Sequence, residues 1–232
     1  GRGEAFYKGK RMPGAQAMEQ AGLPTYHLLA KEGLALINGT QCMTAIGALA
    51  WHDLNEGALL ADVTASMTME ALHGLTNAFE PRLHTVRPHQ GQMRTAANLL
   101  RLLAGSPTME ASRDLRVQDA YALRCVPQVH GAVRDAIDYA KDKLEIEINS
   151  VTDNPILYTE DESVISGGNF HGEPMALLFD YLGIAASELC SISERRLERL
   201  VNPALSNGLP AFLTPHGGLN SGYMICQYSA AS

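Results

Sequence analysis

Three polar side chains between residues 118 and 124 have the chemistry to bind a small carboxylic acid. This stretch reads Gln118-Asp119-Ala120-Tyr121-Ala122-Leu123-Arg124. On a helix, Gln118, Tyr121 and Arg124 stand at i, i+3 and i+6 and share one side. Arginine presents a planar fork of donors that matches a carboxylate, and tyrosine can transfer a proton or donate a hydrogen bond. The triplet therefore predicts a site that binds an amino acid or organic acid by its carboxylate. The alternative is a polar helix face turned to solvent.

Other candidate residues do not form the patterns of a metal, nucleotide or nucleophile site. Five histidines do not share metal-ligand spacing, so we expect no metal site: His84, His89, His130, His171 and His216. Gly167-Gly168 opens no nucleotide-binding unit, and Ser221 lacks the surroundings of a nucleophile elbow. Asp153, before Asn154-Pro155, is interpreted as a turn or cap residue. Glu173 is either functional or a first-turn carboxylate that favours the helix dipole.

Composition narrows the class of protein. The chain has 232 residues, of which 46% are hydrophobic, enough to fill a core. A net charge of −7 and a pI near 5.6 argue against a nucleic-acid partner. No apolar run approaches a membrane span, so we expect no membrane association. Four scattered cysteines without a CxxC pair favour reduced thiols and a cytoplasmic protein.

The pattern of apolar residues predicts long helices. Over 173–200 a seam repeats in steps of four and three, formed by Leu178, Leu182, Ala185, Leu189 and Ile192. Residues 127–144 show a helical period near 3.6, and helices are also predicted over about 40–54, with Thr40 as N-cap, and over 93–103. No alternation of strands and helices occurs. The fold class is therefore predicted as all-α, a bundle of long helices.

The remaining segments are predicted as follows. Residues 1–30 form a surface segment with turns, 81–92 a loop, and 105–114 a polar, mobile segment. At most a short strand is expected, over 145–148. We expect residues 1–232 to make one helical core domain. Because the chain begins at Gly1 and residues 218–232 read as a helix without a stop signal, we expect a fragment of a longer polypeptide.

Taken in order, the motifs resemble those of one enzyme family. They are Asn38-Gly39-Thr40, residues 118–124, Asn149 to Pro155, Gly167 to His171, Leu205 to Pro210 and Gly218 to Gly222. Together they closely resemble the aromatic amino acid ammonia-lyases, which use a methylidene-imidazolone electrophile, over nearly the whole chain. Within this family the chain is most similar to the histidine ammonia-lyases, through His171-Gly172-Glu173-Pro174, residues 87–92 and residues 200–213.

The resemblance implies a fold, a reaction and an assembly. The fold is the long-helix bundle of the ammonia-lyase and fumarase type. The reaction converts L-histidine to trans-urocanate and ammonia without metal or nucleotide. The assembly is a homotetramer whose active sites draw residues from more than one subunit.

The resemblance also implies residue roles. Tyr121 and Asn38 are the catalytic residues, and Arg124, Gln118 and Phe170 bind the substrate. Arg124 holds the carboxylate and Phe170 lines the side-chain pocket. Such roles suit the chemistry, because loss of ammonia requires a good leaving group, a base, a fixed carboxylate and donors that meet developing charge.

The sequence differs from the family pattern in features that bear on activity. The electrophile forms from Ala-Ser-Gly, and no Ala-Ser-Gly occurs among the 232 residues. Ala122 stands where a serine is common. The segment that selects histidine lies beyond the region matching Ser232. We therefore expect the chain alone to be inactive. The alternatives are a catalytically dead assembly module, a phenylalanine or tyrosine lyase, or an aminomutase of the same family.

Overall fold

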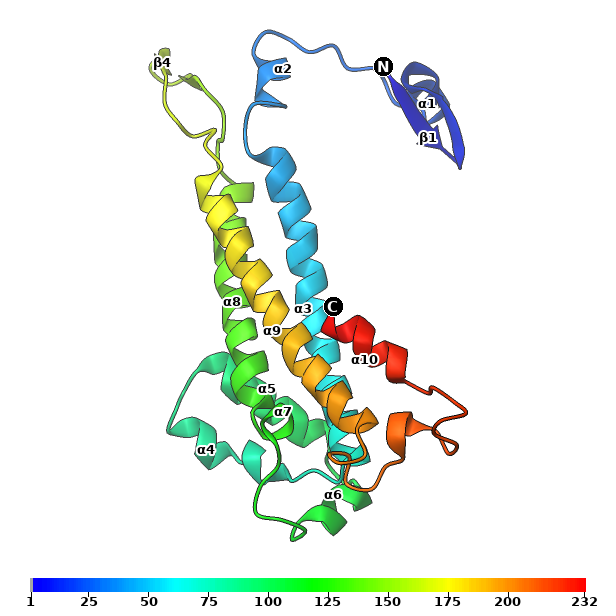
Figure 1. The fold of residues 1–232 in the computed structure, drawn as a ribbon. Coiled ribbons are helices and arrows are strands. Elements are labelled where there is room, and N and C mark those ends of the chain that lie inside the picture. The colour runs from blue at the N-terminus through cyan, green and yellow to red at the C-terminus, as the bar shows by residue number, and fades with distance from the viewer. Residues whose placement is uncertain (1) are drawn as a thin grey trace. The chain divides into compact units, whose positions relative to one another are not determined.

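The computed structural model describes residues 2–232 (Figure 1). The chain falls into two compact units. The smaller unit comprises residues up to 42 together with 151–171, and the larger comprises 43–150 and 172–232. The expectation of one domain over 1–232 stays a prediction.

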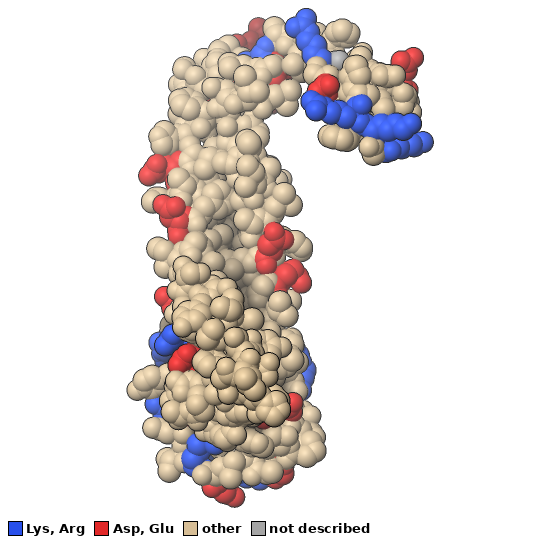
Figure 2. All heavy atoms as spheres, turned by 45° about the vertical axis from the view of Figure 1, so that its right-hand side comes forward, with Lys and Arg blue, Asp and Glu red and all other residues tan. Residues whose placement is uncertain are grey.

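The smaller unit contains two antiparallel hairpins. Strand β1 (Glu4–Tyr7) pairs with β2 (Lys10–Pro13) through a turn in which Lys8 and Gly9 have φ of 48° and 77°, the geometry of a tight two-residue hairpin. Strand β3 (Ile156–Tyr158) pairs with β4 (Ser163–Ile165). Helices α1 (Gly14–Gln20) and α2 (Glu32–Ala35) complete the unit. Lys and Arg side chains gather on the first hairpin (Figure 2).

Three long helices build the larger unit: α3 (Gln41–Ala71), α8 (Val126–Ile148) and α9 (Glu173–Val201). They share one core, to which α3 contributes Ala58 and α8 contributes Val133, Ile137 and Ala140. All five residues of the predicted 178–192 seam are buried. Helix α5 (Gln90–Leu102) packs on α8, and α10 (Met224–Ala231) packs on α9. The predicted all-α bundle is confirmed.

The contact between α5 and α8 depends on two glycines. A Cβ atom on Gly131 would lie 2.4 Å from the backbone N and Cα of Gln92, and one on Gly91 would lie 2.0 Å from the carbonyl oxygen of Gly131. These two helices therefore meet backbone to backbone, which larger residues would prevent.

Short elements appear where loops were predicted. Helix α4 (Pro81–Thr85) opens with proline at its first position and carries the buried His84. Helix α6 (Pro107–Ser112) is capped by Ser106, whose Oγ accepts a 3.3 Å hydrogen bond from the N–H of Met109. The 3₁₀ turns η1 (Thr76–Phe79) and η2 (Ala211–Leu213) lie in other connections. The loop predicted over 81–92 is therefore confined to 86–89, and the mobility expected of 105–114 stays a prediction.

The strand predicted over 145–148 is also wrong, because α8 continues to Ile148. Leu144 extends the buried stripe of α8, and Lys141 and Glu145 form an i,i+4 ion pair at 3.5 Å. Ile146 and Ile148 are exposed, so the alternation of Glu and Ile marks no buried strand face. Among residues 2–232, the strands that form are β1 to β4 of the smaller unit.

Helix α9 differs from expectation in its hydropathy. By length and composition alone, its 29 residues are long and apolar enough to cross a membrane, with a mean hydropathy of 1.5 in the most apolar window. The expectation that no apolar run approaches this length was therefore wrong. The buried seam of α9 packs into the bundle core, and its last turns carry the buried charged residues Glu194 and Arg196.

Candidate functional site

The three side chains singled out at 118–124 do meet in the structure. An N–H of Arg124 donates a hydrogen bond to the Oε1 atom of Gln118, and the Arg124 guanidinium lies 4.6 Å from the ring centroid of Tyr121. A stacked guanidinium with one donor held by an amide has its plane fixed on two sides. The predicted grouping of the triplet is therefore observed.

The triplet is not arranged along one helix face, as the spacing predicted. Helix α7 comprises only Tyr121–Arg124, and Gln118 lies before it. Ala120 has φ −61° and ψ 158°, an extended conformation, so the helix begins one residue later. Asp119 holds this turn through its carboxylate, which accepts a hydrogen bond from the backbone N–H of Leu75 at 2.6 Å. Tertiary contact, and not helical period, brings the three side chains together.

The surroundings of Arg124 suit a small ligand. Arg124 and Gln118 border a cavity of about 180 Å³, whose other walls include Leu75, Ala78 and Leu83. Tyr121 is 72% exposed and reaches solvent beside it. A guanidinium at the edge of a partly apolar hollow can pair with a carboxylate while the rest of the ligand contacts carbon.

Asn38 and Phe170 lie in the smaller unit, whereas the triplet lies in the larger one. Their convergence on Arg124 stays a prediction. Within the smaller unit, residues 151–154 contact the segments that carry both. A Cβ atom on Gly39 would lie 2.3 Å from the carbonyl oxygen of Thr152. The Oδ1 atom of Asn154 accepts a 2.7 Å hydrogen bond from the N–H of Gly167.

Sequence reasoning missed Lys31 in this arrangement and took Asp153 for a simple turn residue. The Nζ atom of Lys31 donates a 2.5 Å hydrogen bond to the Oδ2 atom of Asp153. This bond, the N–H of Asn154 and the side chain of Asn38 lower the pKa of Asp153. The carboxylate therefore sits between Lys31 and Asn38. No local signal marks Lys31, because its partner is 122 residues away.

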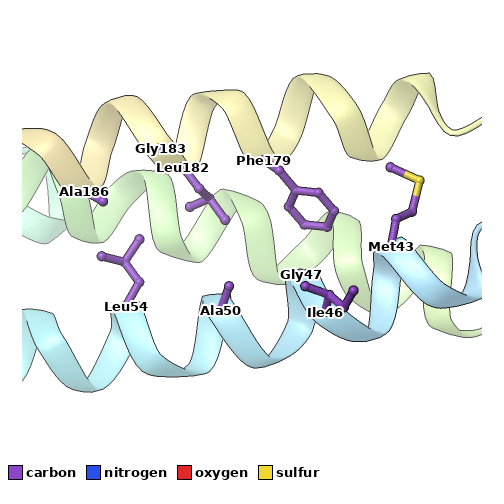
Figure 3. Close-up of a pocket in the computed structure, with 9 residues that line it drawn as sticks. All are labelled: Met43, Ile46, Gly47, Ala50, Leu54, Phe179, Leu182, Gly183 and Ala186. Atoms are coloured by element: carbon purple, nitrogen blue, oxygen red, sulfur yellow. The ribbon is translucent and has the colours of Figure 1, made fainter.

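A larger hollow in the bundle offers no comparable chemistry. It has a volume of about 460 Å³ and lies between α3 and α9. Figure 3 shows Phe179 and Leu182 of α9 facing Ile46, Gly47 and Ala50 of α3. Every residue that lines it is apolar or glycine, so it has no group to orient a polar substrate. Among residues 2–232, no cluster of three or more His, Cys, Asp and Glu side chains is placed to hold a metal ion.

A family model described as aromatic amino acid lyase matches residues 1–232. The chain belongs to the aromatic amino acid lyase family. This confirms the resemblance seen in the motifs.

Individual relatives of this lyase-family chain agree. It is 62% identical over 232 residues to the histidine ammonia-lyase of Alkaliphilus metalliredigens (strain QYMF), covering 100% of the chain and 46% of that protein. The chain thus spans less than half the length of this curated relative.

Among solved structures, the chain is 45% identical to a histidine ammonia-lyase from Trypanosoma cruzi, with a TM-score of 0.83 over 96% of the chain and 41% of that chain. It is 38% identical to a tyrosine aminomutase from Streptomyces globisporus, with a TM-score of 0.89 over 100% of the chain and 48% of that chain.

Enzymes of this family use a self-formed methylidene-imidazolone. The group requires an Ala-Ser-Gly tripeptide, and the sequence contains none. The side chains of this lyase-family chain can bind a ligand, orient it and donate hydrogen bonds to it.

Proposed function

We propose that these residues form the part of a histidine ammonia-lyase that binds the substrate carboxylate. The reaction is the elimination of ammonia from L-histidine to give trans-urocanate. The observation that carries the proposal is the fixed guanidinium of Arg124, held by Gln118 and stacked on Tyr121 at the edge of a small cavity. The identity to histidine ammonia-lyases supports the choice of amino acid.

In this proposal each residue has a defined task. Arg124 pairs with the substrate carboxylate through its fork of donors. Gln118 orients that fork, and the phenol of Tyr121 orients the substrate or transfers a proton. Asn38 donates a hydrogen bond to the bound substrate, and Phe170 lines the pocket for the substrate side chain. Fixing the carboxylate raises the rate because the reacting carbon then keeps one orientation.

The proposal extends to assembly and location. The electrophile comes from residues other than these 232, so the chain alone is inactive. The active protein is a homotetramer in the cytoplasm, with an amino acid as substrate and with neither nucleic acid nor membrane as partner. The net charge of −7 supports the absence of a nucleic-acid partner.

A second candidate is an aminomutase of the same family, which returns the amine to the β-carbon. The similarity in fold to the tyrosine aminomutase supports this second candidate. A catalytically dead assembly module is the third candidate, favoured by the missing tripeptide.

A hybrid enzyme separates these candidates. In the histidine ammonia-lyase of Alkaliphilus metalliredigens, the matching 232 residues are replaced by this chain. The hybrid is incubated with L-histidine, L-tyrosine and L-phenylalanine, and all products are identified. We expect urocanate and ammonia from L-histidine alone, and no product from the 232-residue chain by itself.

Two results would contradict the proposal. A folded hybrid that forms a β-amino acid would indicate the aminomutase. A folded hybrid that converts none of the three amino acids would indicate a dead module. The unaltered Alkaliphilus enzyme is the control for assay and assembly.

A further inference from the structure

Asp119 is buried between two members of the carboxylate-binding triplet. Its side chain is only 2% exposed. The Oδ1 atom accepts a 2.6 Å hydrogen bond from Nε of Arg116, and Oδ2 accepts one of 2.6 Å from the backbone N–H of Leu75. Both oxygens of a buried carboxylate are thus engaged by donors, which satisfies the charge and fixes its position.

The partner of Asp119 is bound to the end of a long helix. The Nη2 atom of Arg116 donates to the carbonyl oxygens of Leu72, at 3.2 Å, and His73, at 2.5 Å. These carbonyls directly follow α3, which ends at Ala71. The last carbonyls of a helix lack intrahelical partners and carry partial negative charge, so a guanidinium is well placed there. Arg116 therefore links the carboxylate of Asp119 to the backbone at the end of α3.

The anchored backbone carries the triplet. Gln118 directly precedes Asp119, and Tyr121 begins α7 two residues after it. Leu123 is 1% exposed and seals the other side of the short helix. A helix of one turn has little stability of its own, so tertiary contacts must fix where its side chains point.

We propose that Asp119, with Arg116, is a positioning residue for Gln118, Tyr121 and Arg124. This inference rests on the proposed function of the triplet. Asp119 touches no substrate; it fixes the backbone from which Gln118 reaches Arg124. Loss of the Asp119 charge breaks its ion pair with Arg116, the backbone at Gln118 is no longer held, and the guanidinium of Arg124 loses its defined orientation.

The test uses Asp119→Asn in the hybrid enzyme. The amide keeps an oxygen for Leu75 but loses the charged pair with Arg116. We expect kcat/KM for L-histidine to fall by about tenfold or more, as small misplacements of positioning groups do. The matched control is Glu110→Gln. It breaks the exposed ion pair, 3.4 Å long, between Glu110 on α6 and Arg113 directly after this helix. The control leaves kcat/KM unchanged.

A double variant distinguishes positioning from general stability. If Asp119 acts through Arg124, adding Asp119→Asn to Arg124→Ala costs much less than the product of the two single effects. Independent, multiplicative effects would overturn the inference. So would a folded Asp119→Asn hybrid whose kcat/KM stays within about twofold of its parent.

A second readout does not require turnover. In the 232-residue chain, Asp119→Asn should shift the side-chain amide resonances of Gln118 in ¹⁵N NMR spectra, and Glu110→Gln should not. If Asp119→Asn prevents folding, Arg116→Lys replaces it, since lysine keeps the charge but lacks the fork. Unmoved Gln118 resonances would overturn the inference. Failure of the proposed function is seen separately, as a parent hybrid without activity on histidine.

Discussion

Asp62 on α3 accepts a hydrogen bond of 2.6 Å from Nη2 of Arg134 on α8, and both side chains are buried. The same carboxylate accepts bonds from Nδ1 of His130, at 2.8 Å, and from the amide of Asn98 on α5, at 3.0 Å. With Nδ1 protonated, Nε2 of His130 is an acceptor for Nη1 of Arg196 on α9, 3.4 Å away. Burial lowers the pKa of Arg196 to about 10. Asp62 thus joins α3 directly to α5 and α8, and His130 extends this network to α9.

Removing this carboxylate should destabilise the protein strongly. Asp62→Ala leaves the guanidinium groups of Arg134 and Arg196 buried without their counter-charge. We expect the free energy of unfolding to fall by about 3–5 kcal/mol. Urea denaturation followed by circular dichroism measures this change.

The control for Asp62 is Asp138→Ala, which removes the exposed ion pair with Arg94, about half of each side chain being in solvent. Its effect should be at most about 1 kcal/mol. Equal losses from the two variants would show that the buried cluster has no special role in stability.

The same cluster should make stability depend on pH. Burial lowers the pKa of His130, although its hydrogen bond to Asp62 acts in the opposite direction. The unfolded chain takes up this proton near the ordinary pKa of about 6.5, and the folded protein takes it up at lower pH. Between these values the unfolded state binds more protons, so the free energy of unfolding falls as pH decreases below about 6.5.

Urea titrations at several pH values between about 5 and 8 check this dependence. His130→Gln keeps a polar group near Asp62 but does not titrate, so its stability should change less with pH. Burial also lowers the pKa of His84, and His84→Gln should remove a separate part of the slope. An unchanged slope in His130→Gln would contradict the assignment.

The crossing of α5 and α8 should not tolerate a side chain at Gly131. Gly131→Ala places a methyl group 2.4 Å from the backbone of Gln92, which cannot move as a flexible side chain could. We expect a loss of about 1–3 kcal/mol in the free energy of unfolding. Gly57→Ala on α3 is the matched control, since a Cβ atom there meets nothing within 4 Å. It should stabilise the protein by about 0.5–1 kcal/mol, and the same sign for both variants would refute the packing argument.

Lys31 should control the ionisation of Asp153. The hydrogen bond from Lys31 is the largest cause of the lowered pKa of Asp153. Lys31→Met should therefore raise this pKa toward its ordinary value of 3.8. Stability from this contact is present above pH 3.8 and is lost as pH falls through the lower folded pKa. Carboxyl ¹³C NMR titration measures the shift, with Lys141→Met as control, and an unmoved Asp153 would remove Lys31 from the contact.

Local pattern predicted the long helices, and distant contacts decided the rest. The leucine seam of α9 is visible in sequence because it repeats within one element. The first hairpin was missed because each of its strands has only four residues, and β2 contains no β-branched or aromatic residue. Its signal was the Lys8-Gly9 turn.

The candidate site shows the same division. Residue type and spacing correctly predicted that Gln118, Tyr121 and Arg124 lie together. They did not predict which contacts bring these side chains together. Asp119 binds Leu75 across 44 residues, and such a contact has no local signature. Helical period therefore predicted a continuous helix, whereas the structure begins α7 only at Tyr121.

The central claim is that Arg124 binds the substrate carboxylate, and Arg124→Ala in the hybrid enzyme tests it most directly. Loss of charge-assisted contacts worth about 1.5–3 kcal/mol predicts a fall of about tenfold to a hundredfold in kcat/KM for L-histidine, with folding intact by circular dichroism. The control is Arg113→Ala, which removes an exposed arginine directly after α6. This variant should leave kcat/KM unchanged. An Arg124→Ala hybrid with the kcat/KM of its parent would contradict the account.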